Sequence, residues 1–137
     1  MKDTKKVTIF TDAAARGNPG KAACAFVFVK NESIFFSSSK FLGNRTNNEA
    51  EYEAIINALK EACKQKFKQI KLYSDSELVV KQITGEYKVK QEHLKKKVEE
   101  VRKLNDCFEE ISFENVPREN EYIQICDKMC NVVLDEN

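Results

Sequence analysis

The sequence predicts one α/β domain, built on a five-stranded mixed sheet flanked by helices. Three apolar segments rich in β-branched and aromatic residues come first, joined by short turns. Segments with helical periodicity then alternate with two further short apolar segments. A length of 137 residues, 42% of them apolar, fits a single domain (1–137) with its own core. We therefore expect the first three strands to pair antiparallel, and the fourth and fifth to run parallel to the first.

The elements follow one another with few ambiguous stretches. The first three strands are predicted at residues 7–14, 22–30 and 32–41, with the turn former Asn31 between the last two. An amphipathic helix over residues 46–66 follows, because five apolar residues form one stripe: Ala54, Ile55, Ala58, Leu59 and Ala62. The remaining elements are a strand (69–76), a short helix ended by Gly85 (76–85), a helix (93–108), a strand (110–117) and a final helix (120–134).

Composition excludes several classes of protein. The net charge is +1, so the molecule as a whole is not a polycation. No apolar run reaches membrane-spanning length and no segment of signal-peptide type follows the polar N-terminus, so we expect a cytoplasmic protein without a membrane partner. We also expect a monomer. The five cysteines are odd in number and include no Cys-x-x-Cys pair, so they do not favour a disulfide framework or a zinc site. For Cys126 and Cys130, four apart on a predicted helix, small core residues are favoured over metal ligands.

Charge is distributed unevenly along the chain. Residues 88–103 hold seven Lys or Arg against three Glu, whereas residues 109–137 hold eight acids against two bases. This asymmetry predicts a basic face and an acidic site on the same small domain. For the basic segment alone, a solvated Lys/Glu helix face is an equally good interpretation.

Two acidic residues come at the ends of apolar strands. Asp12 ends the first predicted strand and Asp75 ends the fourth. Because these strands are expected to be parallel, both carboxylates should lie at the carboxyl edge of the sheet, where open α/β sheets bind ligands. A turn-forming role is the commoner explanation for Asp12 alone, but two acids at equivalent strand ends favour a site.

Two further acids lie beside apolar helix residues. Glu51 lies on the apolar stripe of the first long helix, whereas Glu49 and Glu53 lie off it and are interpreted as ordinary surface residues. Asp127 lies on the last helix, and pairing with a nearby lysine is an equally good explanation for it or for Glu51 taken singly. The neighbours of Asp127 at i−4, i+3 and i+7 are apolar: Ile123, Cys130 and Leu134.

Four inward-facing carboxylates without a basic residue among them cannot all stay ionised in a low-dielectric site. Divalent cations resolve this repulsion, and oxygen-only ligands favour Mg²⁺ over zinc, with Mn²⁺ as a substitute. Two such ions about 4 Å apart would contact both the attacking and the leaving oxygen in phosphodiester hydrolysis. The pattern therefore predicts a two-metal hydrolase site.

Four motifs together resemble ribonuclease HI, in the order and at the spacings of that family. They are TDAAARGNPG, TNNEAEYEAIINAL, LYSDSELVVKQITGEY and VPREN followed by CDKMCN, and the resemblance extends from Val7 to about Val133. The compact archaeal and Gram-positive type, without the basic protrusion of some bacterial members, is the most similar branch. The resemblance implies a ribonuclease H-like fold and two-metal hydrolysis of the RNA strand of RNA–DNA hybrids, leaving 5′-phosphate and 3′-hydroxyl ends.

The resemblance also implies roles for individual residues. Asp12 matches the acid that bridges both metals, and Asp127 matches one that helps to hold the metal that activates water. Glu51 and Asp75 match the acids of the other metal site, and Glu51 also matches a contact to the ribose 2′-hydroxyl, which DNA lacks. The substrate-binding positions implied for this chain are Arg16, Gly17 and Asn18 in the minor-groove turn, Arg45 in a phosphate pocket, Thr46, Asn47 and Asn48 at the start of the helix, and Ser76 after Asp75.

Three departures from the family pattern stand out. Ala13 stands where the family usually has Gly, so either its methyl group crowds the backbone beside the metals or it needs an ordinary β conformation. The loop before the last helix, ENVPRENEY, lacks the histidine of many members, and Arg118 or Glu119 is the candidate substitute. His93 matches no catalytic position. The stretch from Val116 to Asp127 is about two residues longer than the family pattern, which leaves Asp127 the least secure of the four acids.

Alternative functions differ in what the fold would do with nucleic acid. The chief alternative is a binding module that holds RNA–DNA hybrids or double-stranded RNA and cleaves weakly or not at all. Another is a different nuclease of the same fold, such as a junction resolvase or an integrase core, but the GNPG and TNN segments are tied to hybrid binding. A domain of a reverse transcriptase or of a larger fusion is a further interpretation.

Overall fold

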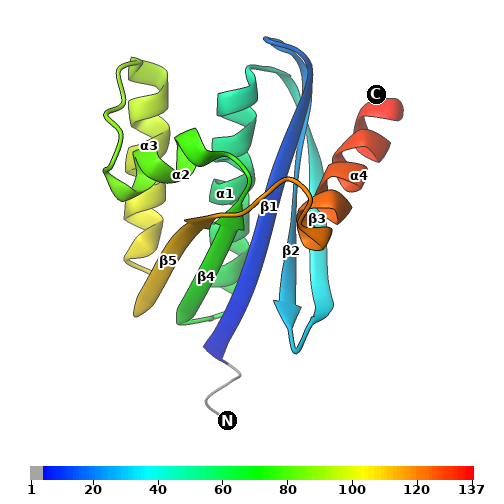
Figure 1. The fold of residues 1–137 in the computed structure, drawn as a ribbon. Coiled ribbons are helices and arrows are strands. Elements are labelled where there is room, and N and C mark those ends of the chain that lie inside the picture. The colour runs from blue at the N-terminus through cyan, green and yellow to red at the C-terminus, as the bar shows by residue number, and fades with distance from the viewer. Residues whose placement is uncertain (1–4) are drawn as a thin grey trace.

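The computed structural model describes residues 5–137, which form strands and helices in the predicted order (Figure 1). Most predicted boundaries lie within a few residues of the observed ones. The elements are β1 (Lys6–Gly17), β2 (Gly20–Lys30), β3 (Ser33–Arg45), α1 (Asn47–Lys64), β4 (Gln69–Ser74), α2 (Glu77–Thr84), α3 (Glu92–Asn105), β5 (Glu110–Asn115) and α4 (Glu121–Asp135).

The five strands form one sheet in the order β3-β2-β1-β4-β5. The β1–β2 and β2–β3 pairs are antiparallel, whereas β4 pairs parallel with β1 and β5 pairs parallel with β4. The predicted fold class is therefore confirmed. This order places β1 at the centre of the sheet, where it is paired on both sides.

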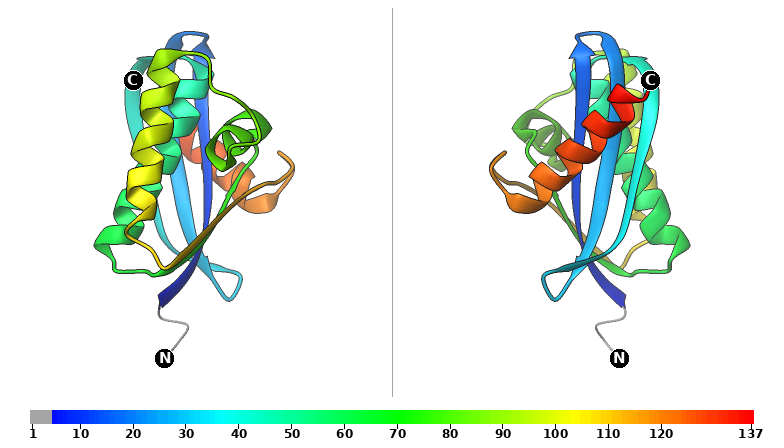
Figure 2. Two further views of the ribbon diagram at one scale, coloured as in Figure 1. Left: turned by 90° about the vertical axis from the view of Figure 1, so that its left-hand side faces the viewer. Right: turned by 90° about the vertical axis from the view of Figure 1, so that its right-hand side faces the viewer.

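Helices cover both faces of the sheet (Figures 1 and 2). On one face, α1, α2 and α3 pack over β1, β2 and β4 through a core that includes Ile9, Phe28, Tyr52, Leu59, Leu72, Val79 and Val101. On the other face, α4 packs diagonally over β1 and β2 through Phe10, Val27, Ile123, Cys126, Cys130 and Leu134. No helix of the described part of the chain is long and apolar enough to cross a membrane.

Strand β1 continues beyond its predicted end at residue 14, to Gly17. Asp12 therefore lies inside the strand, which corrects the expectation that it ends the strand. The reason lies in the two neighbours of β1. Its parallel pairing with β4 stops at Thr11 opposite Ser74, whereas its antiparallel pairing with β2 continues to Gly17 opposite Gly20. Asp12 thus lies where the partner on one side ends, next to Asp75.

The Gly-Asn-Pro-Gly segment makes the tight turn between β1 and β2, with a cis peptide bond between Asn18 and Pro19. Gly17 has a φ of +123°, a conformation that residues with a Cβ rarely adopt. A Cβ on Gly20 would lie 2.5 Å from the carbonyl oxygen of Arg16, so only glycine fits there. The turn residues are therefore fixed by backbone geometry as well as by any contact with a ligand.

The cysteines are divided between two environments. Cys24, Cys126 and Cys130 are free and buried, which confirms the core role predicted for Cys126 and Cys130. Cys63 and Cys107 are linked as a disulfide with a Cα–Cα distance of 5.9 Å, which joins α1 to the segment after α3. Sequence spacing did not predict this pair, because the two residues are 44 positions apart and meet only through the packing of α1 against α3.

Candidate active site

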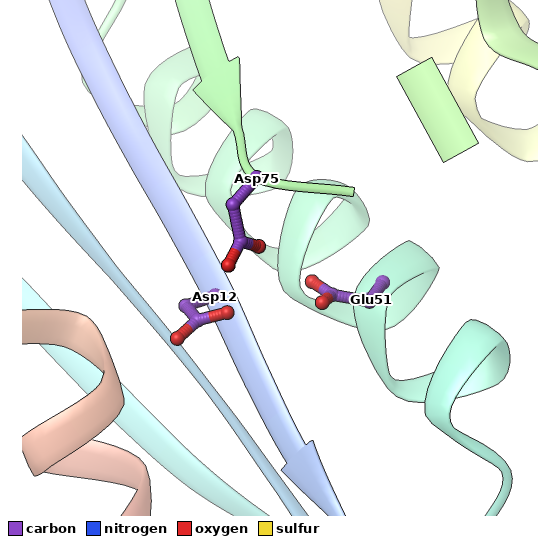
Figure 3. A group of neighbouring side chains, drawn as sticks. All are labelled: Asp12, Glu51 and Asp75. Carbon is purple, nitrogen blue, oxygen red and sulfur yellow. The ribbon is translucent and has the colours of Figure 1, made fainter. Parts of the chain in front are cut away.

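Three carboxylates from separate elements converge beside the centre of the sheet (Figure 3). Asp12 comes from β1, Glu51 from α1, and Asp75 from the segment directly after β4. One oxygen atom of each carboxylate lies within 4.8 Å of one oxygen of the other two. The structure therefore brings together three of the four acids that the sequence predicted for a metal site.

Small side chains allow α1 and α4 to approach the strand that carries Asp12. Ala13 and Ala15 pack against a cluster that includes Ala50 and Ala54 of α1, while Ala14 packs against the core beneath α4. The three consecutive alanines therefore alternate between the two faces of β1. Larger residues at these positions would hold the helices further from the strand, and with them the glutamate of the site.

Ala13 does not disturb the strand. It pairs with Cys24 of β2 within the regular β1 ladder, and it is not among the residues with a positive φ. The second of the two possibilities raised by the sequence is therefore the one observed: the residue has an ordinary extended conformation, and it packs against a cluster that includes Ala50 and Ala54 of α1.

Burial and mutual repulsion raise the pKa values of two of these carboxyls. Asp12 is only 5% exposed. Its burial, followed by the charge of Asp75, raises its pKa from 3.8 to about 8. Burial and then the charges of Asp12 and Asp75 raise the pKa of Glu51 well above its usual value. Three ionised carboxylates are therefore unstable together unless a cation is bound.

One oxygen of Glu51 provides a direct test of whether a metal ion fits. Its Oε1 atom is buried and has no hydrogen-bond partner, although other parts of the residue reach solvent. A buried, unpaired carboxylate oxygen is costly unless it has a ligand. The donor set of three carboxylates suits a hard divalent cation. The residues present thus fit a divalent metal ion, and Asp12, Glu51 and Asp75 would hold it.

Asp127 is not part of this cluster. Its side chain is exposed on α4, which corrects the expectation that it faces inward with its apolar neighbours. The buried face of α4 is formed by Ile123, Cys126, Cys130 and Leu134, so Asp127 lies at the margin of that face. It is nevertheless close enough for its charge to raise the pKa of Asp12.

Arg118 is a basic residue that lies beside the three acids. Its Nε atom lies 3.7 Å from Oδ2 of Asp75, and its side chain is 87% exposed. Its charge also opposes the rise in the pKa of Glu51. Arg118 and Glu119 were the two candidates to replace the loop histidine. The structure shows a contact with the acids for Arg118.

The predicted substrate-binding residues of the first turn and of α1 lie together. Oδ1 of Asn18 accepts a hydrogen bond of 3.0 Å from the backbone N–H of Asn47. Thr46 is the N-cap of α1 and forms a capping box with Glu49. These contacts join the turn to the helix, with Asn48 in the first helical turn beside them.

Other predicted contact residues also have structural roles. Ser76 is the N-cap of α2, where its hydroxyl accepts a hydrogen bond of 3.3 Å from the N–H of Val79. Arg16 donates to Asp135 at 2.7 Å and to Asn131 at 3.2 Å, which ties the end of β1 to α4. These pairs are exposed, so a ligand can compete for them.

Glu49 and Glu53 are not the ordinary surface residues that the sequence indicated. Their side chains are 25% and 16% exposed, and both face basic residues. Glu49 lies 4.0 Å from His93 of α3, and Glu53 lies 2.7 Å from Arg45. Helical periodicity correctly placed both residues off the apolar stripe, but it could not show that α3 covers that side of α1.

A surface depression of about 1130 Å³ lies elsewhere. It is lined by polar and aromatic residues of β1, β4 and β5 such as Thr8, Lys71, Tyr73 and Ser112, and by none of the predicted site residues. A depression of this size can hold a ligand. We place the candidate site at Asp12, Glu51 and Asp75 instead, because these converging carboxylates can bind a divalent cation.

The sequence is similar to a known protein family and to several curated proteins. The reverse transcriptase-like family model matches residues 10–131. Ribonuclease HI of Halobacterium salinarum is 37% identical over 132 residues, which are 96% of this chain and 65% of the relative. A bifunctional protein of Mycobacterium tuberculosis is 38% identical over 133 residues, which are 95% of this chain and 36% of the relative. The chain thus spans two thirds or less of these curated relatives.

Solved structures match the whole fold. The crystal structure of RNase H1 from Halobacterium salinarum superposes with a TM-score of 0.91 at 37% identity, over 96% of this chain and 99% of that chain. The structure of LC11-RNase H1 in complex with an RNA/DNA hybrid superposes with a TM-score of 0.86 at 34% identity, over 95% of this chain and 97% of that chain. Together with the sheet order and the three converging carboxylates, these matches show that the chain belongs to the ribonuclease HI family.

Proposed function

We propose that this protein is an endoribonuclease that hydrolyses the RNA strand of RNA–DNA hybrids with two divalent metal ions, leaving 5′-phosphate and 3′-hydroxyl ends. The observation that carries the proposal is the cluster of Asp12, Glu51 and Asp75, with its buried, unpaired Glu51 oxygen. The solved complex of a relative with an RNA/DNA hybrid supports the choice of substrate. We propose Mg²⁺ as the ion, with Mn²⁺ as a substitute, and a monomer as the active form.

Each acid has a distinct position for this chemistry. Asp12 is central and the most buried of the predicted acids, which suits it to bridge two ions. Glu51 and Asp75 flank it, and Asp127 is proposed as the fourth acid, on the opposite side, from α4. When bound, divalent ions would neutralise these charges, activate a water molecule and stabilise the leaving oxygen.

The remaining predicted residues would hold the hybrid. The turn at residues 16–18 and the start of α1 at residues 45–48 are joined by the hydrogen bond between Asn18 and Asn47, so they form one continuous surface. We propose that this surface and Ser76 contact the backbones of the two strands. Glu51 would select RNA through the ribose 2′-hydroxyl, which DNA lacks.

A cleavage assay tests the proposed function. The protein is incubated with labelled RNA–DNA hybrid, double-stranded RNA and double-stranded DNA, each with Mg²⁺, Mn²⁺ or EDTA. We expect cuts in the RNA strand of the hybrid that require a divalent ion, and hybrid affinity that falls as salt rises. The absence of any metal-dependent cut would contradict the proposal.

A hybrid-binding or double-stranded-RNA-binding module with weak or no cleavage is the second candidate, and the exposure of Asp127 outside the carboxylate cluster favours it. The same assay separates the two functions. A binding module holds hybrid or double-stranded RNA with an affinity that falls with salt, but leaves the RNA strand intact in every metal condition.

Substitution of Arg118 should slow turnover. We expect Arg118→Ala to lower kcat about tenfold, because the guanidinium 3.7 Å from Asp75 is positioned to bind the phosphate product and assist its departure. Steady-state kinetics on a short hybrid measure this change. Glu119→Gln changes one charge in the same loop at the other candidate position, and its kcat should stay at the wild-type level. Equal kcat values for Arg118→Ala and wild type would rule out the assigned role.

A further inference from the structure

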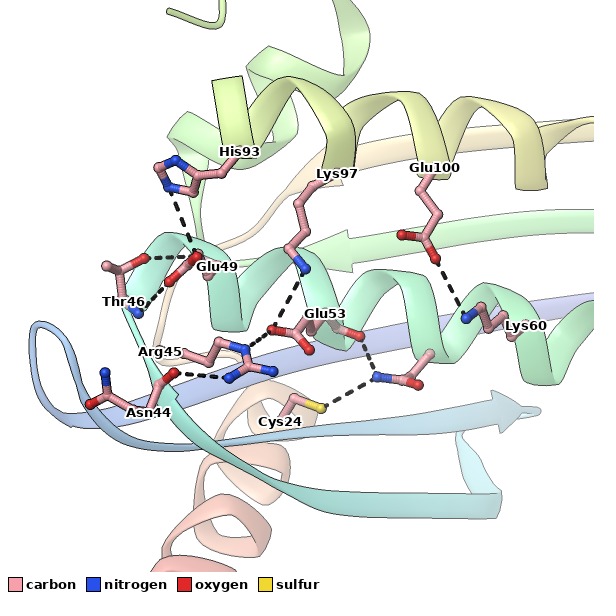
Figure 4. Close-up of polar contacts among 11 residues, drawn as sticks. Cys24, Asn44, Arg45, Thr46, Glu49, Glu53, Lys60, His93, Lys97 and Glu100 are labelled. Atoms are coloured by element: carbon pink, nitrogen blue, oxygen red, sulfur yellow. Dashed lines mark hydrogen bonds and ion pairs between the residues drawn. The ribbon is translucent and has the colours of Figure 1, made fainter. Parts of the chain in front are cut away.

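Arg45, Glu53 and Lys97 form a cluster of charges on the outer surface of α1 (Figure 4). Oε2 of Glu53 accepts a hydrogen bond of 2.7 Å from Nε of Arg45, and it lies 3.8 Å from Nζ of Lys97. The three residues come from β3, α1 and α3, so tertiary packing assembles the cluster. One carboxylate faces two cations, and the cluster keeps a net positive charge.

Arg45 is held in one orientation within this cluster. Its Nε atom donates to Glu53, and its Nη1 atom donates to the carbonyl oxygen of Asn44 at 2.9 Å. Among residues 5–137, these two contacts are the hydrogen bonds found for the Arg45 side chain, so its Nη2 group remains available to a ligand. The arginine side chain is 37% exposed, whereas Glu53 beneath it is 16% exposed. The carboxylate thus acts as a support and the guanidinium forms the accessible edge.

The cluster adjoins the surface proposed to hold the hybrid. Arg45 pairs with Gly20 of the β1–β2 turn at the end of β3, directly before the Thr46 cap of α1. The hydrogen bond between Asn18 and Asn47 closes the same corner. A guanidinium in a fixed orientation at this position suits a phosphate, whose oxygens match its paired N–H groups.

We propose that Glu53 is a positioning residue for nucleic-acid binding: it fixes the Arg45 guanidinium so that it binds a backbone phosphate, while Lys97 balances the carboxylate charge. This inference rests on the proposed function, since it assumes that the surface at α1 binds a hybrid. The role differs from that of the neighbouring Glu51, because Glu53 contacts cations of the protein rather than the carboxylate cluster.

Positioning and simple electrostatics predict opposite results, which makes the inference testable. Removing an acid beside a phosphate site should strengthen binding if only net charge matters. If Glu53 orients Arg45, its removal should weaken binding, because the arginine must then be ordered by the ligand itself. A purely structural role for Glu53 would instead lower the melting temperature and kcat.

The experiment measures KM and kcat for Mg²⁺-dependent hybrid cleavage by Glu53→Leu, together with its melting temperature. We expect KM to rise about fivefold, with kcat within about twofold of wild type and an unchanged melting temperature. Glu53→Gln keeps an acceptor oxygen for Arg45, so its KM should be equal to or below that of wild type. Glu61→Leu is the matched control, since it removes an acid from the same helix about 12 Å further along.

A double-mutant cycle assigns the effect to Arg45. Arg45→Ala should raise KM, and adding Glu53→Leu to it should cause no further rise. A lower or unchanged KM for Glu53→Leu, or an equal rise in the absence of Arg45, would overturn the inference while wild-type cleavage upholds the proposed function. If the wild-type protein neither binds nor cleaves the hybrid, the proposed function fails, and this inference fails with it.

Discussion

Asp12→Asn should abolish cleavage of the RNA strand while the affinity for an RNA–DNA hybrid stays within about twofold of wild type. Asp12 is the buried centre of the carboxylate cluster, and an amide cannot supply the charge that a divalent ion requires. We expect a loss of turnover on the order of 1000-fold or more. Single-turnover cleavage with Mg²⁺ measures turnover, and fluorescence anisotropy with a labelled hybrid measures the affinity.

Two other aspartates calibrate this result. Asp106 lies at an exposed position directly after α3 and is not part of the cluster. Asp106→Asn should therefore leave turnover unchanged. Asp127→Asn should reduce turnover by less than Asp12→Asn, because Asp127 is exposed and influences the cluster from outside it. Residual activity near the wild-type level in Asp12→Asn would refute the assignment of the metal site.

Without a divalent ion, the free energy of unfolding should fall as pH rises from about 4 to about 8. Asp12 ionises at its ordinary pKa of 3.8 when the chain is unfolded, but burial and the charge of Asp75 raise its pKa to about 8 in the folded protein. The unfolded state therefore releases its proton first, so ionisation favours unfolding across this window. We expect the melting temperature in EDTA to be about 5 °C lower at pH 8 than at pH 5.

Addition of Mg²⁺ should restore most of this loss at pH 8 and change little at pH 5. Ions that bind the folded protein alone stabilise it, and at pH 5 protons compete with these ions for the carboxylates. Asp12→Asn is the control, because it removes both the buried charge and a metal ligand, and its melting temperature should depend less on pH and on Mg²⁺. A melting temperature in EDTA that rises from pH 5 to pH 8 would contradict the predicted repulsion among the acids.

The order and type of the elements were predictable from local patterns. The stripe of α1, the alternation of strands and the stop at Gly85, which has a φ of +89°, are properties of neighbouring residues. The extension of β1 to Gly17 and of β3 to Arg45 was not predictable in this way. These segments are strands because they pair with β2, and strand pairing depends on partners distant in the sequence.

The residues of the candidate site also differ in whether the sequence alone could predict them. Asp12, Glu51 and Asp75 were recognisable because each lies beside an apolar run where a carboxylate is costly. The neighbours of Asp127 gave the same signal, yet its side chain is exposed, since a helix position between buried residues can still face the margin. Arg118 was a candidate beforehand, but its contact with the acids became visible only in the folded structure.

The sequence by itself determined the fold class, the central acids and the turn glycines, because burial, helical periodicity and backbone conformation act between near neighbours. Only the tertiary structure decided how charges from different elements meet. It placed Asp12 where the partner strand β4 ends, and it set Glu53 between Arg45 and Lys97. Those contacts depend on how β3, α1 and α3 pack together, and no spacing along the chain records that packing.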